Sequence, residues 1–212
     1  MRPSVDWRLC FVADAGTAAG RDLAPIVEKA VRGGATIVQL RAKSLGAREF
    51  LDAAKKLAGQ LKRSRIPFIV NDRVDIALAC GADGIHLGRD DMPYAEARRL
   101  MGRERLVGLS AATAEEAEEA ERLGADYIGV WPVFPTSTKE TGRPPLGCDG
   151  LKAIRSRVGI AILAIGGIST ENAADVIAAG ADGVAVVSAI LSAPDPERAA
   201  AALIAAVGPR RT

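Results

Sequence analysis

Aromatic residues are scarce in this sequence, where Phe, Trp and Tyr together make up 4% of 212 residues. So few rings argue against a surface on which single-stranded nucleic acid would stack. The charge balance points the same way, because 28 basic and 26 acidic residues leave a net charge of only +2. Binding of nucleic acid driven by bulk charge needs far more. We therefore expect no nucleic-acid partner.

Cysteine and histidine are rarer still, with three cysteines and a single histidine, His86. Cys10, Cys80 and Cys148 lie far apart without Cys-x-x-Cys spacing, which argues against a metal or redox motif. Any disulfide would leave one cysteine over, so a reducing, cytoplasmic setting is the simplest interpretation and the cysteines are read as packing residues. One histidine cannot build a multi-histidine metal site. Because His86 lies inside the apolar run GIHLG, we expect a hydrogen-bonded core residue.

Long apolar runs are also missing. No segment approaches the ~18 apolar residues that suggest a membrane span, and the first residues, MRPSVDWRLCFVADAG, lack the apolar stretch of a signal peptide. We therefore expect no membrane partner and no signal peptide. Hydrophobic residues still make up 49% of the chain, which is typical of a globular protein. The sequence leaves open whether the chain forms a homo-oligomer.

The sequence does contain a recurring pattern. Gly-Ala, followed by Asp in three of four cases, opens a short apolar run at positions 34, 81, 124 and 180, each time after a stretch typical of a helix. Glycine favours the left-handed end of a helix, and the run after it is typical of a buried parallel strand. Each interval has room for two strand–helix units. We expect strands near 8–13, 36–40, 66–71, 83–87, 105–109, 126–130, 161–165 and 182–187, and helices near 20–33, 47–63, 73–80, 93–101, 114–123, 149–157, 170–179 and 195–207.

Eight strands alternating with eight helices predict an α/β fold, a (β/α)8 TIM barrel. An open doubly wound sheet is the alternative, although it would contain fewer strands around one nucleotide crevice. No linker or break in composition divides the chain. We therefore expect one barrel domain over residues 1–212, with a frayed tail at 209–212.

Polar residues and glycines follow the predicted strands, at the end of the barrel where active sites form. They are Gln39, Arg41 and Lys43 after the second strand, Asn71 and Asp72 after the third, Asp91 after the fourth, Ser110 after the fifth, Thr136, Ser137, Thr138 and Lys139 in the loop after the sixth, Gly166 and Gly167 after the seventh, and Val187 and Ser188 after the eighth. The glycine turn and the matching turn at Val187-Ser188 indicate a phosphate cradle, with ordinary tight turns as the alternative.

Two of these residues, Asp72 and Asp91, follow neighbouring strands. Carboxylate oxygens are ligands that Mg²⁺ accepts, often together with substrate phosphates and water. The competing interpretation is a helix cap at Asp72 and a turn at Asp91. Lys43, Lys139 and Arg41 are cations that suit anionic groups, although any one of them is also a common solvated surface residue.

Taken in order, these motifs resemble the thiamine-phosphate synthase family. The resemblance rests on VQLRAK at 38–43, VNDRVDIALACGADGIHLGRDDMP at 70–93, VGLSAAT at 107–113, GADYIGVWPVFPTSTK at 124–139, AIGGIS at 164–169 and GADGVAVVSAI at 180–190. It implies a transferase on a (β/α)8 barrel. The pyrimidinylmethyl group of a hydroxymethylpyrimidine diphosphate would pass to the ring nitrogen of a thiazole phosphate, which gives thiamine phosphate and pyrophosphate.

The resemblance also implies roles for individual residues. The pyrimidine diphosphate site would contain Gln39, Arg41, Lys43, Asn71, Ser110 and Lys139, of which Lys43, Ser110 and Lys139 would be catalytic. The thiazole phosphate site would contain Thr136, Ser137, Thr138, Gly167, Val187 and Ser188. Asp72 and Asp91 would hold the Mg²⁺ cofactor. Charge on the departing pyrophosphate would be stabilised by the metal and the lysines, so no side-chain nucleophile is needed.

Three positions depart from the family's pattern. Trp131 replaces a usual glycine, Ala112 replaces a larger polar residue or histidine, and the first strand lacks a common tyrosine. A related activity on this barrel, thiazole tautomerase, would use a histidine after the fifth strand, where this chain has Ser110-Ala111-Ala112-Thr113. A non-catalytic barrel that binds phosphate ligands is the other alternative, and pyrophosphate release would separate it from an enzyme.

Overall fold

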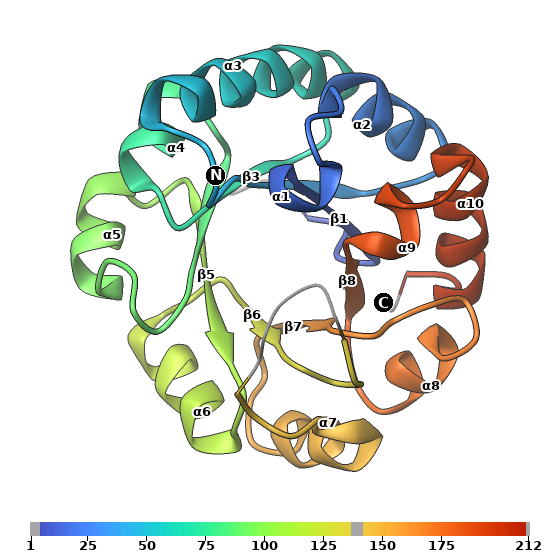
Figure 1. The fold of residues 1–212 in the computed structure, drawn as a ribbon. Helices are drawn as coiled ribbons and strands as arrows, with labels where there is room; N and C mark the ends of the chain where they lie inside the picture. The colour runs from blue at the N-terminus through green and yellow to red at the C-terminus, as the bar shows by residue number, and fades with distance from the viewer. Residues whose placement is uncertain (1–4, 137–141, 211–212) are drawn as a thin grey trace.

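The chain folds as a closed barrel of eight parallel strands that follow one another around the barrel in sequence order. The structure, a computed structural model, describes residues 5–136 and 142–210. Figure 1 looks along the barrel axis, with the strands in the inner ring and the helices outside it. The predicted (β/α)8 barrel is therefore confirmed, and the open-sheet alternative is wrong.

The strands and helices alternate along the described chain. The strands are β1 (Leu9–Asp14), β2 (Ile37–Arg41), β3 (Phe68–Asn71), β4 (Gly84–Leu87), β5 (Leu106–Ala111), β6 (Tyr127–Val130), β7 (Ala161–Ile165) and β8 (Gly183–Val186). The helices are α1 (Ala15–Ala18), α2 (Leu23–Arg32), α3 (Ala47–Ser64), α4 (Val74–Cys80), α5 (Tyr94–Met101), α6 (Ala114–Leu123), α7 (Gly147–Arg155), α8 (Ala173–Ala178), α9 (Ser188–Leu191) and α10 (Pro196–Val207). None of these helices in the described part of the chain is long and apolar enough to cross a membrane.

The predicted elements are all present, and their ends differ by at most three residues from the prediction. The helix expected from residue 20 begins later because Asp22 caps it, accepting a hydrogen bond from Ala24 N at 3.1 Å. The short helices α1 and α9 were not predicted. Each has only four residues and directly follows a strand, so neither shows a helical period in the sequence. The last two residues lie outside the described chain, and the frayed tail stays a prediction.

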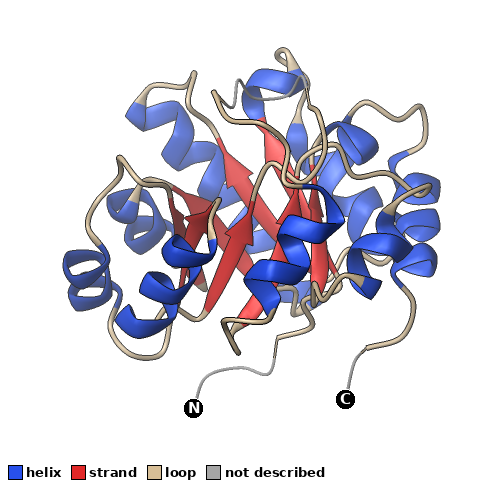
Figure 2. Ribbon diagram, turned by 90° about the horizontal axis from the view of Figure 1, so that it is seen from below, coloured by secondary structure: helices blue, strands red, loops and turns tan. Residues whose placement is uncertain are grey.

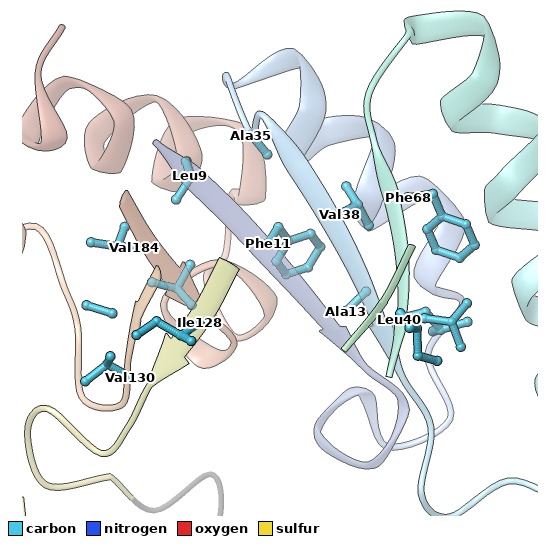
Figure 3. Close-up of a cluster of buried hydrophobic side chains, with 14 of the residues drawn as sticks. Leu9, Phe11, Ala13, Ala35, Val38, Leu40, Phe68, Ile128, Val130 and Val184 are labelled. Carbon is cyan, nitrogen blue, oxygen red and sulfur yellow. The ribbon is translucent and has the colours of Figure 1, made fainter. Parts of the chain in front are cut away.

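Alternate residues of each strand face two different cores. On β1, Leu9, Phe11 and Ala13 pack in the large shell between strands and helices, whereas Cys10 and Val12 belong to a smaller cluster inside the barrel. Figure 2 shows the strands enclosed by helices, and in Figure 3 the outward side chains follow one another along β1. Burial raises the pKa of the Cys10 thiol to about 12, in agreement with its predicted role as a packing residue.

The repeated Gly-Ala-Asp pattern forms a clasp at the amino-terminal end of the strands. Asp83 accepts a hydrogen bond from Phe68 N at 2.9 Å, and its own N–H donates to Phe68 O at 2.9 Å. Asp126 and Asp182 make the same pair of bonds to Val107 and Ile162. In the first repeat Thr36 replaces aspartate and makes both bonds to Leu9. The four clasps therefore join β1 to β2, β3 to β4, β5 to β6 and β7 to β8.

Candidate active site

A cavity of about 120 Å³ opens at the carboxyl ends of the strands. Its lining contains most of the described residues that the sequence predicted for the site: Gln39, Arg41, Asn71, Ser110, Thr136, Gly167, Val187 and Ser188. The inward-facing positions become polar toward this end. On β1 the next inward-facing residue after Val12 is Asp14, and on β3 the next one after Ile69 is Asn71. The barrel thus has an apolar floor and a polar mouth.

Arg41 is held by a partner that the sequence reasoning missed. Asp14, at the end of β1, is 3% exposed and forms an ion pair with the Arg41 guanidinium. The same carboxylate accepts a hydrogen bond from Thr17 N at 2.7 Å and so caps α1. Burial alone would raise the pKa of Asp14, but the hydrogen bonds from Thr17 and Arg41 outweigh it and lower this pKa. Asp14 therefore stays charged and orients Arg41, which lines the cavity.

Gln39 and Asn71 form a second polar pair on the neighbouring strands β2 and β3. Gln39 Nε2 donates to Asn71 Oδ1 at 2.8 Å, and the two residues are 6% and 8% exposed. The bond leaves Gln39 Oε1 and Asn71 Nδ2 for other partners. Buried amides of this kind can present both a donor and an acceptor to a heterocyclic ligand.

The two predicted metal ligands lie together beside this pair. Asp72 has a left-handed backbone, with φ of 65°, and its carboxylate contacts Lys43 Nζ at 3.1 Å. Burial raises the pKa of Asp72, and the adjacent carboxylate of Asp91 raises it further. The helix-cap interpretation of Asp72 is wrong, because Arg73 is the N-cap residue of α4 and α4 begins at Val74. The turn at Asp91 is present, since its carboxylate accepts from Gly88 N at 2.6 Å.

This pair of carboxylates fits a hard divalent cation. Two facing acidic groups, one partly buried, repel each other unless a cation or a proton lies between them. The described residues contain no group of three or more His, Cys, Asp or Glu side chains that could hold a metal. Asp72 and Asp91 offer two carboxylates, a donor set that would suit Mg²⁺ if substrate phosphates and water completed the shell.

Across the barrel, the turn after β7 is covered by the loop after β6. Gly167 has a φ of 64°, and a Cβ built on it would lie 2.4 Å from Pro135 O. Phe134 N donates to Gly166 O at 3.0 Å, which ties the loop to this turn. The close approach that Gly167 allows is thus to the loop backbone, a constraint that the sequence did not reveal. Beside it, Ser188 begins α9, whose first N–H groups have no helical partner.

Ser110, predicted to be catalytic, is hydrogen bonded to the one histidine. His86 Nε2 lies 3.0 Å from Ser110 Oγ, and His86 Nδ1 lies 3.1 Å from Tyr127 Oη. The interpretation of His86 as a hydrogen-bonded buried residue is confirmed, with 5% exposure. However, His86 also lines the cavity. His86 lies one residue before the end of β4, close to the face where the active site forms, and this place in the strand was its signal in the sequence.

The loop after β6 is described only in part. Trp131 and Thr136 line the cavity, so the tryptophan that departs from the family's glycine forms part of the wall. Ser137, Thr138 and Lys139 lie outside the described residues, and their roles stay predictions.

Comparisons with known proteins identify the family. A family model described as thiamine monophosphate synthase matches residues 9–190. A thiamine-phosphate synthase of Chloroflexus aurantiacus is 53% identical over 203 residues, which is 96% of this chain and 94% of the relative. One of Syntrophomonas wolfei is 47% identical and covers 91% of this chain and 92% of its own.

A solved structure gives the same result. The thiamine phosphate pyrophosphorylase of Pyrococcus furiosus superposes with a TM-score of 0.87 and 37% identity, covering 95% of this chain and 96% of its own. Identity this high over nearly the full length of each relative goes beyond a shared barrel. The chain therefore belongs to the thiamine monophosphate synthase family.

Proposed function

We propose that this barrel, a thiamine-phosphate synthase, transfers the pyrimidinylmethyl group of a pyrimidine diphosphate to the nitrogen of a thiazole phosphate through Mg²⁺-assisted departure of pyrophosphate. The observation that carries the proposal is the arrangement around one cavity. Arg41 lines the cavity at the end of β2, and Lys43, Asp72 and Asp91 follow β2, β3 and β4 outside its lining. Gly167 and Ser188 line the cavity after β7 and β8. Two anionic substrates can thus be held on opposite sides with their reacting ends between them.

The first side suits the diphosphate. Arg41, oriented by Asp14, and Lys43, in contact with Asp72, supply positive charge. Asp72 and Asp91 are the ligands for Mg²⁺, which when bound neutralises the charge of the leaving group. Lys139, by its place in the sequence, adds a further cation.

The second side suits the thiazole phosphate. Gly167 and Val187 offer backbone groups at turns that line the cavity, and Ser188 adds a hydroxyl. Thr136 lines the same wall, and the sequence predicts Ser137 and Thr138 next to it. These neutral donors bind a phosphate without the metal.

The reaction needs few protein groups beyond these. As the C–O bond of the pyrimidine diphosphate breaks, negative charge grows on the leaving pyrophosphate and positive charge grows on the methylene carbon. The aminopyrimidine spreads the positive charge, and fixed cations stabilise the negative charge. The thiazole nitrogen then uses its own lone pair to form the C–N bond. Gln39, Asn71 and Ser110 hold the pyrimidine, and the apolar floor limits access of water.

The test is release of pyrophosphate by the purified protein when both substrates and Mg²⁺ are supplied. We expect release to require both substrates and to stop in excess chelator. Asp72→Asn and Asp91→Asn should each slow it strongly. Asp90→Asn is the matched control, because Asp90 is exposed beside Asp91 and should leave the rate unchanged. Binding of both substrates without release would instead favour the non-catalytic phosphate-binding barrel.

A further inference from the structure

A chain of three side chains runs from the floor of the barrel to the cavity. The Tyr127 hydroxyl lies 3.1 Å from His86 Nδ1, and His86 Nε2 lies 3.0 Å from Ser110 Oγ. Tyr127 is 1% exposed, His86 is 5% exposed, and Ser110 is half-buried where it lines the cavity. The three residues come from the adjacent strands β6, β4 and β5. The contacts therefore connect a fully buried phenol to a residue that lines the cavity.

Two glycines on these strands make room for the rings. A Cβ on Gly108 would lie 2.1 Å from Tyr127 Cζ, and a Cβ on Gly129 would lie 2.9 Å from His86 Cε1. Tyr127 also packs on Trp7, with 4.9 Å between ring centroids. Because any side chain at Gly108 or Gly129 would displace a ring, the strands fit this arrangement closely. The rings are thus fixed in place by the barrel itself.

The burial of Tyr127 decides which atom donates and which accepts in its hydrogen bond to His86. Complete burial raises the pKa of its phenol well above the ordinary value, so the hydroxyl keeps its proton. Within the described part of the chain, the Tyr127 hydroxyl makes its hydrogen bond to His86 Nδ1. A buried O–H needs an acceptor, because a donor left unpaired costs about 1–3 kcal/mol. The hydroxyl therefore donates to Nδ1, and a neutral imidazole must then carry its proton on Nε2.

Ser110 is the last residue in this series of hydrogen bonds. When His86 Nε2–H donates to Ser110 Oγ, the serine acts as the acceptor in that bond. A hydroxyl can accept and donate at the same time, so its own proton is left for an acceptor on the cavity side. The opposite tautomer would reverse this, because Ser110 would then donate to the imidazole and turn lone pairs toward the ligand.

We propose that Tyr127 is a positioning residue that fixes His86 as the Nε2–H tautomer, so that Ser110 donates its proton to an acceptor atom of the pyrimidine diphosphate. The tautomer is argued from the need of the buried Tyr127 hydroxyl for an acceptor, whereas the last clause rests on the proposed function. Tyr127 does not line the cavity, so it would act through two other side chains.

The test uses the fact that His86 is the one histidine in the chain. Nitrogen-15 NMR of protein labelled at histidine therefore reports the tautomer of His86 without assignment and without substrate. We expect a protonated Nε2 and an unprotonated Nδ1 in the wild type. An Nδ1–H tautomer, or a doubly protonated ring, at the assay pH would overturn the proposal before any variant is made.

Tyr127→Phe should keep the packed ring and remove the hydroxyl. We expect a mixed His86 tautomer and a kcat about 10-fold lower, the lower end of what loss of an orienting partner costs a histidine at a metal site. KM for the thiazole phosphate should not change. The matched control is Tyr94→Phe, because Tyr94 is the other tyrosine of the chain. It lies on the outer helix α5, where its hydroxyl donates to Gly124 O at 2.5 Å. Tyr94→Phe should change neither the spectrum nor the rate.

Two further outcomes are decisive. If Tyr127→Phe has the wild-type tautomer and the wild-type kcat, Tyr127 positions nothing and the proposal is wrong. If the wild-type protein releases no pyrophosphate, the proposed function fails, while the nitrogen-15 spectrum still decides whether Tyr127 sets the tautomer. Ser110→Ala tests the role of Ser110 separately from the tautomer, because it should lower kcat while His86 keeps its Nε2 proton.

Discussion

Asp14→Asn tests whether the buried ion pair with Arg41 both stabilises the fold and positions Arg41 in the site. The substitution removes the negative charge while keeping the shape of the side chain. Asparagine is also as good a helix cap as aspartate, so the hydrogen bond from Thr17 N, 2.7 Å long in the wild type, should survive. The change therefore isolates the ion pair from the cap.

The size of the effect follows from burial. Removing one partner of a buried ion pair typically costs about 3–5 kcal/mol, because the other charge is left uncompensated. Asp14 is buried, but the Arg41 side chain is 22% exposed, so water can compensate part of the loss. We expect the free energy of unfolding to fall by about 1–3 kcal/mol at pH 7, below the fully buried case.

The pH dependence gives an independent check. The pKa of Asp14 is lowered in the folded protein, so its charge stabilises the fold above the unfolded pKa of about 3.9. This stabilisation is lost as the pH falls through the folded pKa. The difference between wild type and Asp14→Asn should therefore be constant between about pH 5 and pH 8 and shrink toward about pH 3.

The measurement is urea unfolding of both proteins across this pH range, together with KM for the pyrimidine diphosphate, which should rise. Asp22→Asn is the matched control, because Asp22 also caps a helix and pairs with a cation, Lys56, but both side chains are 57% exposed. It should cost less than about 1 kcal/mol. Equal losses from the two substitutions, or a difference that does not depend on pH, would refute the reasoning.

Three further predictions concern the loop after β6 and its surroundings. Gly167→Val should raise KM for the thiazole phosphate and also lower the melting temperature, because its Cβ would lie 2.4 Å from Pro135 O; an unchanged melting temperature in thermal unfolding would contradict this contact. Trp131→Gly should enlarge the cavity that Trp131 lines and raise KM for at least one substrate, as steady-state kinetics would show. Lys139→Ala should lower kcat by roughly 10²–10³ in single-turnover experiments while KM for the thiazole phosphate changes little, the scale of losing one preorganised electrostatic donor. A change in KM alone would make Lys139 an anchor of the ground state.

The alternation of strands and helices was predictable because each unit carries its own local signals. Glycine ends such as Gly81 and Gly124 take left-handed backbones, and the apolar runs that follow them are buried strands. The position of the site followed from the same reasoning, since parallel strands bring their carboxyl ends to one face. Short-range pattern and barrel geometry were sufficient for this much.

What the sequence could not predict are the contacts between elements distant in the chain. Asp14 reads as the end of a strand, and its pairing with Arg41 depends on the register of β1 with β2. Tyr127 reads as a core residue, and its bond to His86 crosses β5 through the space left at Gly108. The distance in sequence between the two residues of each pair does not predict their contact, because both contacts depend on how the closed barrel aligns its strands.

The clasps at the amino-terminal ends give the barrel a modular construction. Each clasp joins an odd-numbered strand to the next one, and the loops at the carboxyl ends take no part in it. A circular permutant opened between residues 64 and 66 would leave all four clasps uncut, whereas one opened between residues 33 and 35 would separate Thr36 from Leu9 along the chain. Each quarter barrel of two strands therefore carries its own pair of hydrogen bonds at one face, while its loops at the carboxyl ends lie at the opposite face. We expect such two-strand units to be exchangeable between related barrels without loss of these bonds.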